Sequence, residues 1–312
     1  MTDNDLDAPP QPPDQGTLAR TPRVASAPGL SRLQVDFCGV RGSLPAAGRE
    51  YVRYGGHTSC LALTADGAEL PTLILDAGTG TRRATHLFAD APFDGTVLLT
   101  HLHWDHTMGL PFFSAADRDG ARVTVILPEQ DDAADATAVL TGLMKPPYFP
   151  VGPTELRGHW SCQSIAPGEC QLEGFSVLAR EIPHKGGRTF GYRVSDDHST
   201  IAYMPDHNPT ALGPGEDGFG EYHAAAMELA RDVDLLVHDA QLLPAELDAE
   251  GDFGHAVADY PVALAERAGA RAVALFHHRL NRTDDALDQL AGRLARDRPA
   301  VSVATEGVVL DL

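Results

Sequence analysis

The chain is organised around the stretch Thr100-His101-Leu102-His103-Trp104-Asp105-His106-Thr107-Met108-Gly109-Leu110, which contains four potential metal ligands in six residues. The stretch follows Thr96-Val97-Leu98-Leu99, a short and continuous apolar run that predicts a buried strand. Alternate side chains share a face in an extended segment, so His101 and His103 can face one ion while the next turn presents Asp105 and His106 to another. Imidazoles suit zinc, and carboxylates suit zinc, manganese or iron. These groups at a strand end indicate a metal site rather than a solvated histidine-rich loop.

The pattern His101-x-His103-x-Asp105-His106 resembles the HxHxDH signature of the metallo-β-lactamase superfamily. The resemblance extends over residues 33–312 and implies an α/β fold. The expected architecture is the αββα sandwich, in which two facing mixed sheets are flanked by helices. A core of that size fits a single hydrolase domain over residues 32–312.

Residues 1–31 differ in composition from the rest of the chain. They are rich in proline, carry scattered acids and contain few large apolar side chains. Such a segment cannot bury enough apolar surface to offset its ordering entropy. We therefore expect a disordered tail before the domain.

Composition limits the partners and the compartment. The sequence has 44 Asp and Glu against 24 Lys and Arg, a formal charge of −20, which opposes attraction to phosphate backbones and acidic membranes. The four cysteines form no CxxC pair, as expected in a reducing compartment. No apolar run approaches membrane-spanning length. We expect a soluble, cytoplasmic protein without a membrane partner.

The remaining elements alternate between strands and helices, which predicts two βα-rich halves facing each other. The expected strands cover residues 33–37, 72–76, 122–127, 175–179, 200–203, 234–237, 272–276, 301–303 and 308–310. The expected helices cover residues 131–144, 256–268 and 283–297.

Three early features each allow two interpretations. Arg41, or the backbone amides near it, can approach a substrate phosphate, or the glycine-rich turn there can simply form a hairpin. Asp76 can support a liganding histidine, as an Asp at this place commonly does in the superfamily, or it can cap a turn. The proline-rich loop 145–150 can close over a small ligand or cover one flank of the core.

Later motifs resemble the ribonuclease Z and cyclic-phosphodiesterase branch. His184, followed by Phe190-Gly191-Tyr192-Arg193, resembles the third ligand of the first ion. Asp206 matches the carboxylate that bridges both ions in the phosphodiesterase and glyoxalase branches. Class B β-lactamases have Cys at that position, so the resemblance argues against antibiotic hydrolysis.

The last motifs supply an acid pair and the final ligand. His238-Asp239 resembles the His-Glu segment of this branch, with Asp in place of Glu. Gly254-His255 resembles the Gly-His pair of the branch, whose His works with that acid. The alternative role for His255 is to cap the following helix. His277 is the expected final ligand of the second ion, with His278 as the alternative.

The resemblance thus implies two divalent ions, with Zn²⁺ expected and Mn²⁺ or Fe²⁺ as alternatives. The first ion is held by His101, His103 and His184, the second by Asp105, His106 and His277, and Asp206 lies between them. A metal-bridging hydroxide is the expected nucleophile, because bound metals lower the pKa of water to about 7. Asp105 would orient it, and His255 with Asp239 would protonate the leaving oxygen.

The expected substrate is a small, cyclic phosphodiester. Ribonuclease Z carries a long basic arm between its third His and its bridging Asp, whereas only 22 positions (206 − 184) separate His184 from Asp206 here. The short spacing and the acidic charge make tRNA an unlikely partner. A thioester or lactone hydrolase and a non-catalytic metal- or nucleotide-binding sensor are the alternatives, and a homodimer is frequent among similar proteins.

Overall fold

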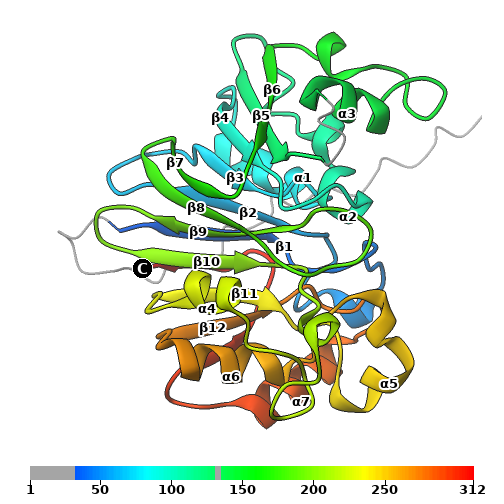
Figure 1. Cartoon of the computed structure of the whole chain (residues 1–312). Coiled ribbons are helices and arrows are strands. Elements are labelled where there is room, and N and C mark those ends of the chain that lie inside the picture. Colours follow the sequence, from blue (N-terminus) through cyan, green and yellow to red (C-terminus); the bar gives the residue numbers. More distant parts are fainter. Residues whose placement is uncertain (1–31, 131–134) are drawn as a thin grey trace, which may run out of the picture.

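The computed structural model describes residues 32–130 and 135–312, so the predicted tail and the start of the predicted helix 131–144 lie outside the described residues. Within these ranges the chain forms two seven-stranded sheets (Figure 1). The first sheet has the order β14-β1-β2-β3-β4-β5-β6 and the second the order β13-β12-β11-β10-β9-β8-β7. Each half of the chain thus builds most of one sheet, and only β14 returns to the other.

The bounds of the strands are as follows. The first sheet contains β1 (Gln34–Gly39), β2 (Cys60–Thr64), β3 (Leu73–Leu75), β4 (Asp94–Leu98), β5 (Arg122–Pro128), β6 (His159–Ile165) and β14 (Val309–Asp311). The second contains β7 (Gly168–Leu172), β8 (Phe175–Glu181), β9 (Phe190–Ser195), β10 (Thr200–Met204), β11 (Leu235–Asp239), β12 (Ala272–Phe276) and β13 (Ala300–Val303).

Helices cover the outer faces of both sheets. They are α1 (Thr81–Ala84), α2 (Trp104–Thr107), α3 (Ala136–Leu143), α4 (Ala224–Ala230), α5 (Leu247–Glu250), α6 (Asp259–Ala268) and α7 (Asp284–Leu294). In Figure 1, α1 and α3 lie to the right of β3, β4 and β5, and α6 and α7 lie below β12. The predicted αββα sandwich is confirmed.

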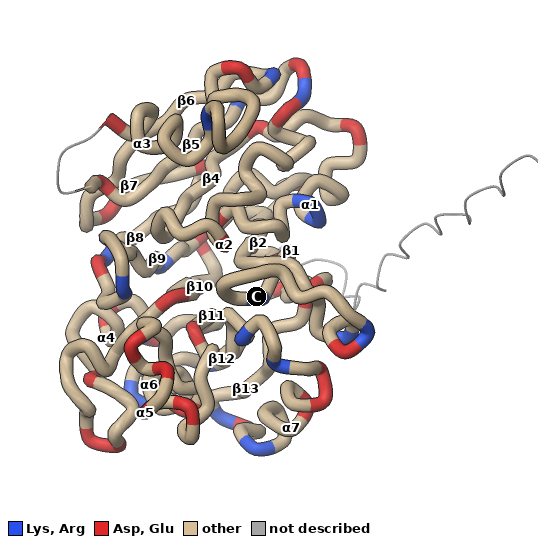
Figure 2. Tube along the Cα trace, turned by 90° about the vertical axis from the view of Figure 1, so that its right-hand side faces the viewer, with Lys and Arg blue, Asp and Glu red and all other residues tan. Residues whose placement is uncertain are grey.

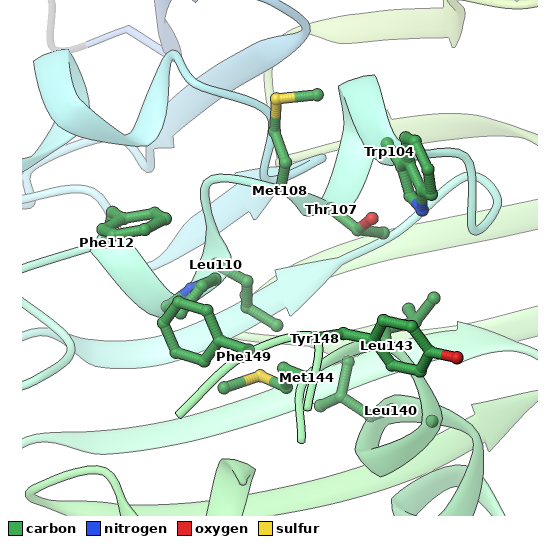
Figure 3. Close-up of a pocket in the computed structure, with 12 residues that line it drawn as sticks. Trp104, Thr107, Met108, Leu110, Phe112, Leu140, Leu143, Met144, Tyr148 and Phe149 are labelled. Atoms are coloured by element: carbon green, nitrogen blue, oxygen red, sulfur yellow. The ribbon is translucent and has the colours of Figure 1, made fainter. Parts of the chain in front are cut away.

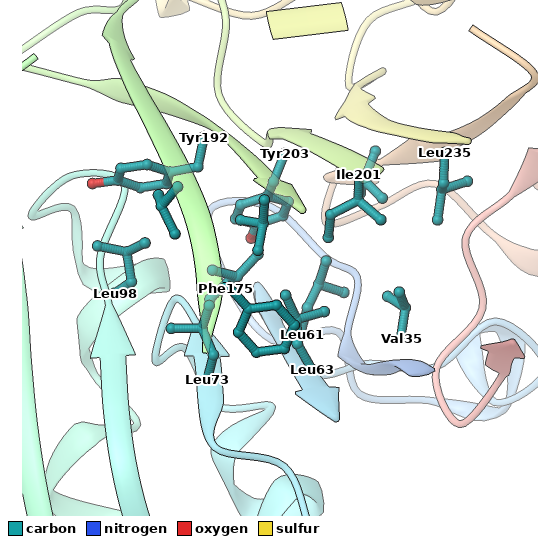
Figure 4. Packing of buried hydrophobic residues seen from close by; sticks show 14 of the residues in the cluster. Val35, Leu61, Leu63, Leu73, Leu98, Phe175, Tyr192, Ile201, Tyr203 and Leu235 are labelled. Atoms are coloured by element: carbon teal, nitrogen blue, oxygen red, sulfur yellow. The ribbon is translucent and has the colours of Figure 1, made fainter. Parts of the chain in front are cut away.

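The core between the sheets explains why the strands are apolar. In β2, Leu61 and Leu63 face the other sheet, while Cys60 and Ala62 face the helices. In β10, Ile201 and Tyr203 likewise belong to the core between the sheets (Figure 4). Strands that are buried on both faces read as continuous apolar runs rather than as an alternation.

The structure adds elements that the sequence did not predict and shortens others. The edge strands β6 and β7 are partly exposed and carry few buried side chains, so they lack an apolar signal. The predicted helix 256–268 begins only at Asp259, because the backbone of Ala256 and Ala258 bonds to Leu242. The predicted helix 283–297 spans Asp284–Leu294.

The strand ends position the site. Strands β3, β4, β5 and β6 run parallel to one another, as do β10, β11, β12 and β13. Ligands of open α/β sheets bind beyond the carboxyl ends of such strands. His101, Asp206 and His277 follow directly after β4, β10 and β12.

No helix among the described residues is long and apolar enough to cross a membrane.

Candidate metal centre

Of the three groups of potential metal ligands at these strand ends, two contain the predicted ligands and share Asp206, and the third consists of Asp239, His255 and His277. Each residue in a group offers a donor atom within 4.8 Å of the others. The first group is His101, His103, His184 and Asp206. The second group is Asp105, His106, Asp206 and His277. The structure therefore brings together all seven predicted ligands, with Asp206 in both groups.

The two carboxylate oxygens of Asp206 face different groups. Its Oδ2 lies 3.6 Å from His101 Nε2 and 3.3 Å from His184 Nε2. Its Oδ1 lies 3.0 Å from the Nε2 atoms of both His106 and His277. A tetrahedral ion with bonds of about 2.0–2.2 Å needs donor atoms about 3.3 Å apart. The spacing matches a carboxylate between two ions.

Buried atoms without partners support the same interpretation. Among the described residues, His101 Nε2 and Asp206 Oδ1 are buried, aimed into these groups, and have no hydrogen-bond partner. An unpaired buried polar atom costs about 1–3 kcal/mol. Coordination of a cation would satisfy both atoms, so the residues fit divalent metal ions.

In the first group the protonation states favour binding. Burial lowers the pKa of His101, of His103 and of His184 below the ordinary value, which favours the neutral imidazoles that bind metals. Burial acts to raise the pKa of Asp206, but His277 and His106 lower it well below the usual range. The carboxylate is therefore ionised.

Asp76 fixes the ligands from behind. It follows β3, and its Oδ2 lies 2.7 Å from His106 Nδ1 and accepts a hydrogen bond of 2.9 Å from the Tyr203 hydroxyl. Its Oδ1 accepts from the Thr100 backbone N–H at 2.7 Å. The Thr100 hydroxyl also contacts His101 Nδ1 at 3.1 Å. Of the two interpretations of Asp76, the geometry supports the one in which it orients a ligand.

His255 and Asp239 form the expected pair. His255 Nδ1 lies 2.9 Å from Asp239 Oδ2, and backbone N–H groups of His207, Gln241 and Ala256 donate to the same carboxylate. The shorter Asp thus reaches its partner. Burial acts to lower the pKa of His255, but Asp239 raises it to about 9. His255 also lines a cavity of about 390 Å³ beside His103, Asp105 and Asp206.

Residues 41–43 approach the site differently from one of the sequence hypotheses. The Arg41 side chain is fully buried, donates to the carbonyls of Gly55 and Arg282, and lies 3.8 Å from Asp284. It is therefore a structural residue and does not face a substrate. The Ser43 backbone N–H donates to Asp105 Oδ2 at 2.6 Å, so a backbone amide does reach the site.

Sequence reasoning missed a chain of three histidines behind the site. His207 Nδ1 lies 2.9 Å from His238 Nε2, and His207 Nε2 lies 2.8 Å from His223 Nε2. His238 Nδ1 donates to the Asp239 carbonyl at 2.8 Å, so the Nε2 of a neutral His238 accepts from His207 Nδ1–H. His207 Nε2 then accepts from His223 Nε2–H. His207 and His238 stand next to Asp206 and Asp239 in the sequence, and that adjacency was the available signal.

Comparison with known proteins gives the family. A model described as "Beta-lactamase superfamily domain" matches residues 72–278, about two thirds of the chain. The chain belongs to the β-lactamase superfamily. A ribonuclease Z of Halorubrum lacusprofundi is 25% identical over 289 residues, which cover 78% of this chain and 86% of the relative.

Solved structures share the fold of this superfamily member. The metallo-β-lactamase fold protein YhfI from Bacillus subtilis has a TM-score of 0.65 at 18% identity and covers 91% of this chain and 100% of its own. A diphosphatase from the PhnP family has a TM-score of 0.62 at 18% identity and covers 90% and 98%. The predicted family, fold and metal-dependent hydrolase class are confirmed. The relatives named ribonuclease Z partly conflict with the expectation that tRNA is an unlikely partner.

Proposed function

We propose that the protein is a dinuclear metal-dependent phosphodiesterase acting on a small, cyclic phosphodiester. The observation that carries the proposal is the Asp206 carboxylate, whose two oxygens face two separate groups of ligands. A site for a single ion would not need the second group. Relatives named ribonuclease Z and a PhnP-family diphosphatase neighbour support chemistry at a phosphate.

The donor set favours zinc. His101, His103 and His184 would hold the first ion and Asp105, His106 and His277 the second, with Asp206 between them. Imidazole and carboxylate donors suit Zn²⁺, while Mn²⁺ and Fe²⁺ accept the same set. Two such ions supply a water of lowered pKa and stabilise charge on a phosphate.

Asp105 and His255 are the side chains that would accept a hydrogen bond from the water and donate a proton to the leaving group. Burial acts to raise the pKa of Asp105, but His106 and His277 lower it, so this carboxylate stays an acceptor that can orient a water. Burial acts to lower the pKa of His255, but the adjacent Asp239 raises it to about 9 and so favours the protonated imidazole. His255 faces the cavity beside Asp105 and can give its proton to a departing oxygen, while Asp239 stabilises the imidazolium.

Charge and loop length favour a small substrate over tRNA. The formal charge is −20, and Figure 2 shows acidic residues on both halves of the molecule. The 22 positions from His184 to Asp206 (206 − 184) hold β9 and β10 with short connections. A long basic arm has no room in that segment.

The test combines metal content with hydrolysis of bis-p-nitrophenyl phosphate. We expect about two ions per chain in the wild type and turnover that Asp206→Ala abolishes. Asp197→Ala, at an exposed turn, is the matched control and should behave as the wild type. If turnover occurs, 2′,3′- and 3′,5′-cyclic nucleotides test the cyclic substrate.

Other outcomes would overturn the proposal. Two ions without turnover of any phosphodiester would favour a thioester or lactone hydrolase. Less than one ion per chain, in protein purified without a chelator, would favour the non-catalytic sensor.

A further inference from the structure

A second cavity, of about 560 Å³, lies beside the metal centre. Two segments form its walls. One runs from Trp104 in α2 to Phe112 in η3 (Leu110–Phe112), and the other runs from Leu140 in α3 to Phe149 in the loop 145–150 (Figure 3). The rings of Phe112 and Phe149 meet edge to face, with centroids 5.6 Å apart, and join the two walls.

The cavity shares a wall residue with the cavity at the metal centre. Trp104 lines both this cavity and the smaller one that contains His103, Asp105, Asp206 and His255. It stands between two predicted ligands in the sequence, and its side chain is 77% exposed. A molecule whose acidic group lies at the ions would therefore place its substituent against this indole.

The walls offer apolar surface rather than polar recognition. Within the described chain, no charged side chain lines this cavity. The hydroxyl of Thr107 already donates to the His103 carbonyl. Tyr148 and Phe112 are 82% and 62% exposed, so large aromatic surface faces solvent at the rim. Exposed apolar surface of this kind marks a binding site.

We propose that this cavity binds an alkyl or aryl substituent of the substrate, so that the enzyme selects small phosphodiesters with an apolar group. This inference rests on the proposed phosphodiesterase function. A polyanionic substituent would find no cation here, whereas each buried methylene gains up to about fourfold in affinity.

A glycine in α3 provides the variant. A Cβ built on Gly142, which lines the cavity, meets no atom within 4 Å. Gly142→Phe therefore adds a ring at the wall of the cavity without a clash at its Cβ. Gly292 in α7 is also helical, exposed and free of contacts within 4 Å, so Gly292→Phe is the matched control.

The probes are methyl, butyl and octyl phosphate, added to the zinc-loaded protein. Trp104 fluorescence reports binding in a Trp160→Phe background, since the sequence has two tryptophans. Half-burial of each methylene predicts about a twofold gain, so Kd should fall about 16-fold from butyl to octyl phosphate. Gly142→Phe should abolish most of this chain-length gain, and Gly292→Phe should keep it.

The outcomes separate this inference from the proposed function. Equal affinity for butyl and octyl phosphate, or an unchanged gain in Gly142→Phe, would overturn the inference even if bis-p-nitrophenyl phosphate is hydrolysed. If Kd falls about 16-fold from butyl to octyl phosphate but no phosphodiester is hydrolysed, the apolar site is retained and the phosphodiesterase function is overturned. A dimer that Gly142→Phe dissociates, without any chain-length gain, would assign the cavity to a second copy of the chain.

Discussion

Replacing Asp76 by Asn should weaken the second metal site while leaving the shape of the side chain unchanged. The carboxylate has four neighbours that can donate to it: the backbone N–H and hydroxyl of Thr100, His106 Nδ1 and the Tyr203 hydroxyl. An amide has one oxygen, so it cannot accept from all four. It also removes the charge that holds the His106 ring with Nε2 toward the ion.

The size of the effect follows from these contacts. If the Asn oxygen stays with His106 and Tyr203, the amide NH₂ faces the backbone N–H of Thr100. One unpaired buried N–H costs about 1–3 kcal/mol of unfolding free energy. Loss of a carboxylate behind a liganding His typically costs about 10–100-fold in metal affinity. His106 belongs only to the second group, so the second ion should carry most of the loss.

The assay is zinc titration against a chromophoric chelator, with urea unfolding of the metal-free protein alongside. Tyr203→Phe is the control, because it removes one donor and keeps the carboxylate. It should change the affinity for the second ion less than about threefold, the weaker effect expected when the carboxylate remains. If Asp76→Asn binds each of the two ions as tightly as the wild type does, the reasoning is refuted.

Three further predictions concern single side chains. His255→Ala should lower kcat about 100-fold or more for a phosphodiester with an alkoxide leaving group. The loss should be much smaller for bis-p-nitrophenyl phosphate, because its leaving group needs little protonation. Equal losses of kcat for the two substrates would count against His255 as the general acid. Arg41→Met should lower the unfolding free energy by about 1–3 kcal/mol in urea, because the buried carbonyls of Gly55 and Arg282 lose their donor, and should leave metal content unchanged. An unchanged unfolding free energy with lower turnover would place Arg41 at the substrate. His277→Gln should lose one ion, whereas His278→Gln should keep two, since His278 Nε2 donates to the Ala304 carbonyl. The opposite result would make His278, not His277, the ligand of the second ion.

The sequence predicted the ligands because they follow apolar strands directly. His101, Asp206 and His277 each come one to three residues after a strand buried on both faces, and such strands are visible as apolar runs. The carboxyl ends of parallel strands meet at one edge, so order along the chain was enough to bring these residues together.

Features built from surface segments were less predictable. The apolar cavity joins η3 to the loop 145–150, and neither segment has a periodic pattern. The two interpretations of that loop, ligand closure or core cover, could not be separated without the packing of Phe149 on Phe112. The buried Arg41 was equally ambiguous, because its partners are backbone carbonyls, which no sequence pattern reveals.

The division of ligands between the two sheets has a consequence for folding. His106 and His277 are 171 positions apart, and His103 and His184 are 81 apart, so neither group of ligands is complete within one half of the chain. Two bound ions would act as cross-links between the halves, closing long loops that are costly to order. A chain interrupted before β12 has no complete second site, so metal content reports how far assembly has gone.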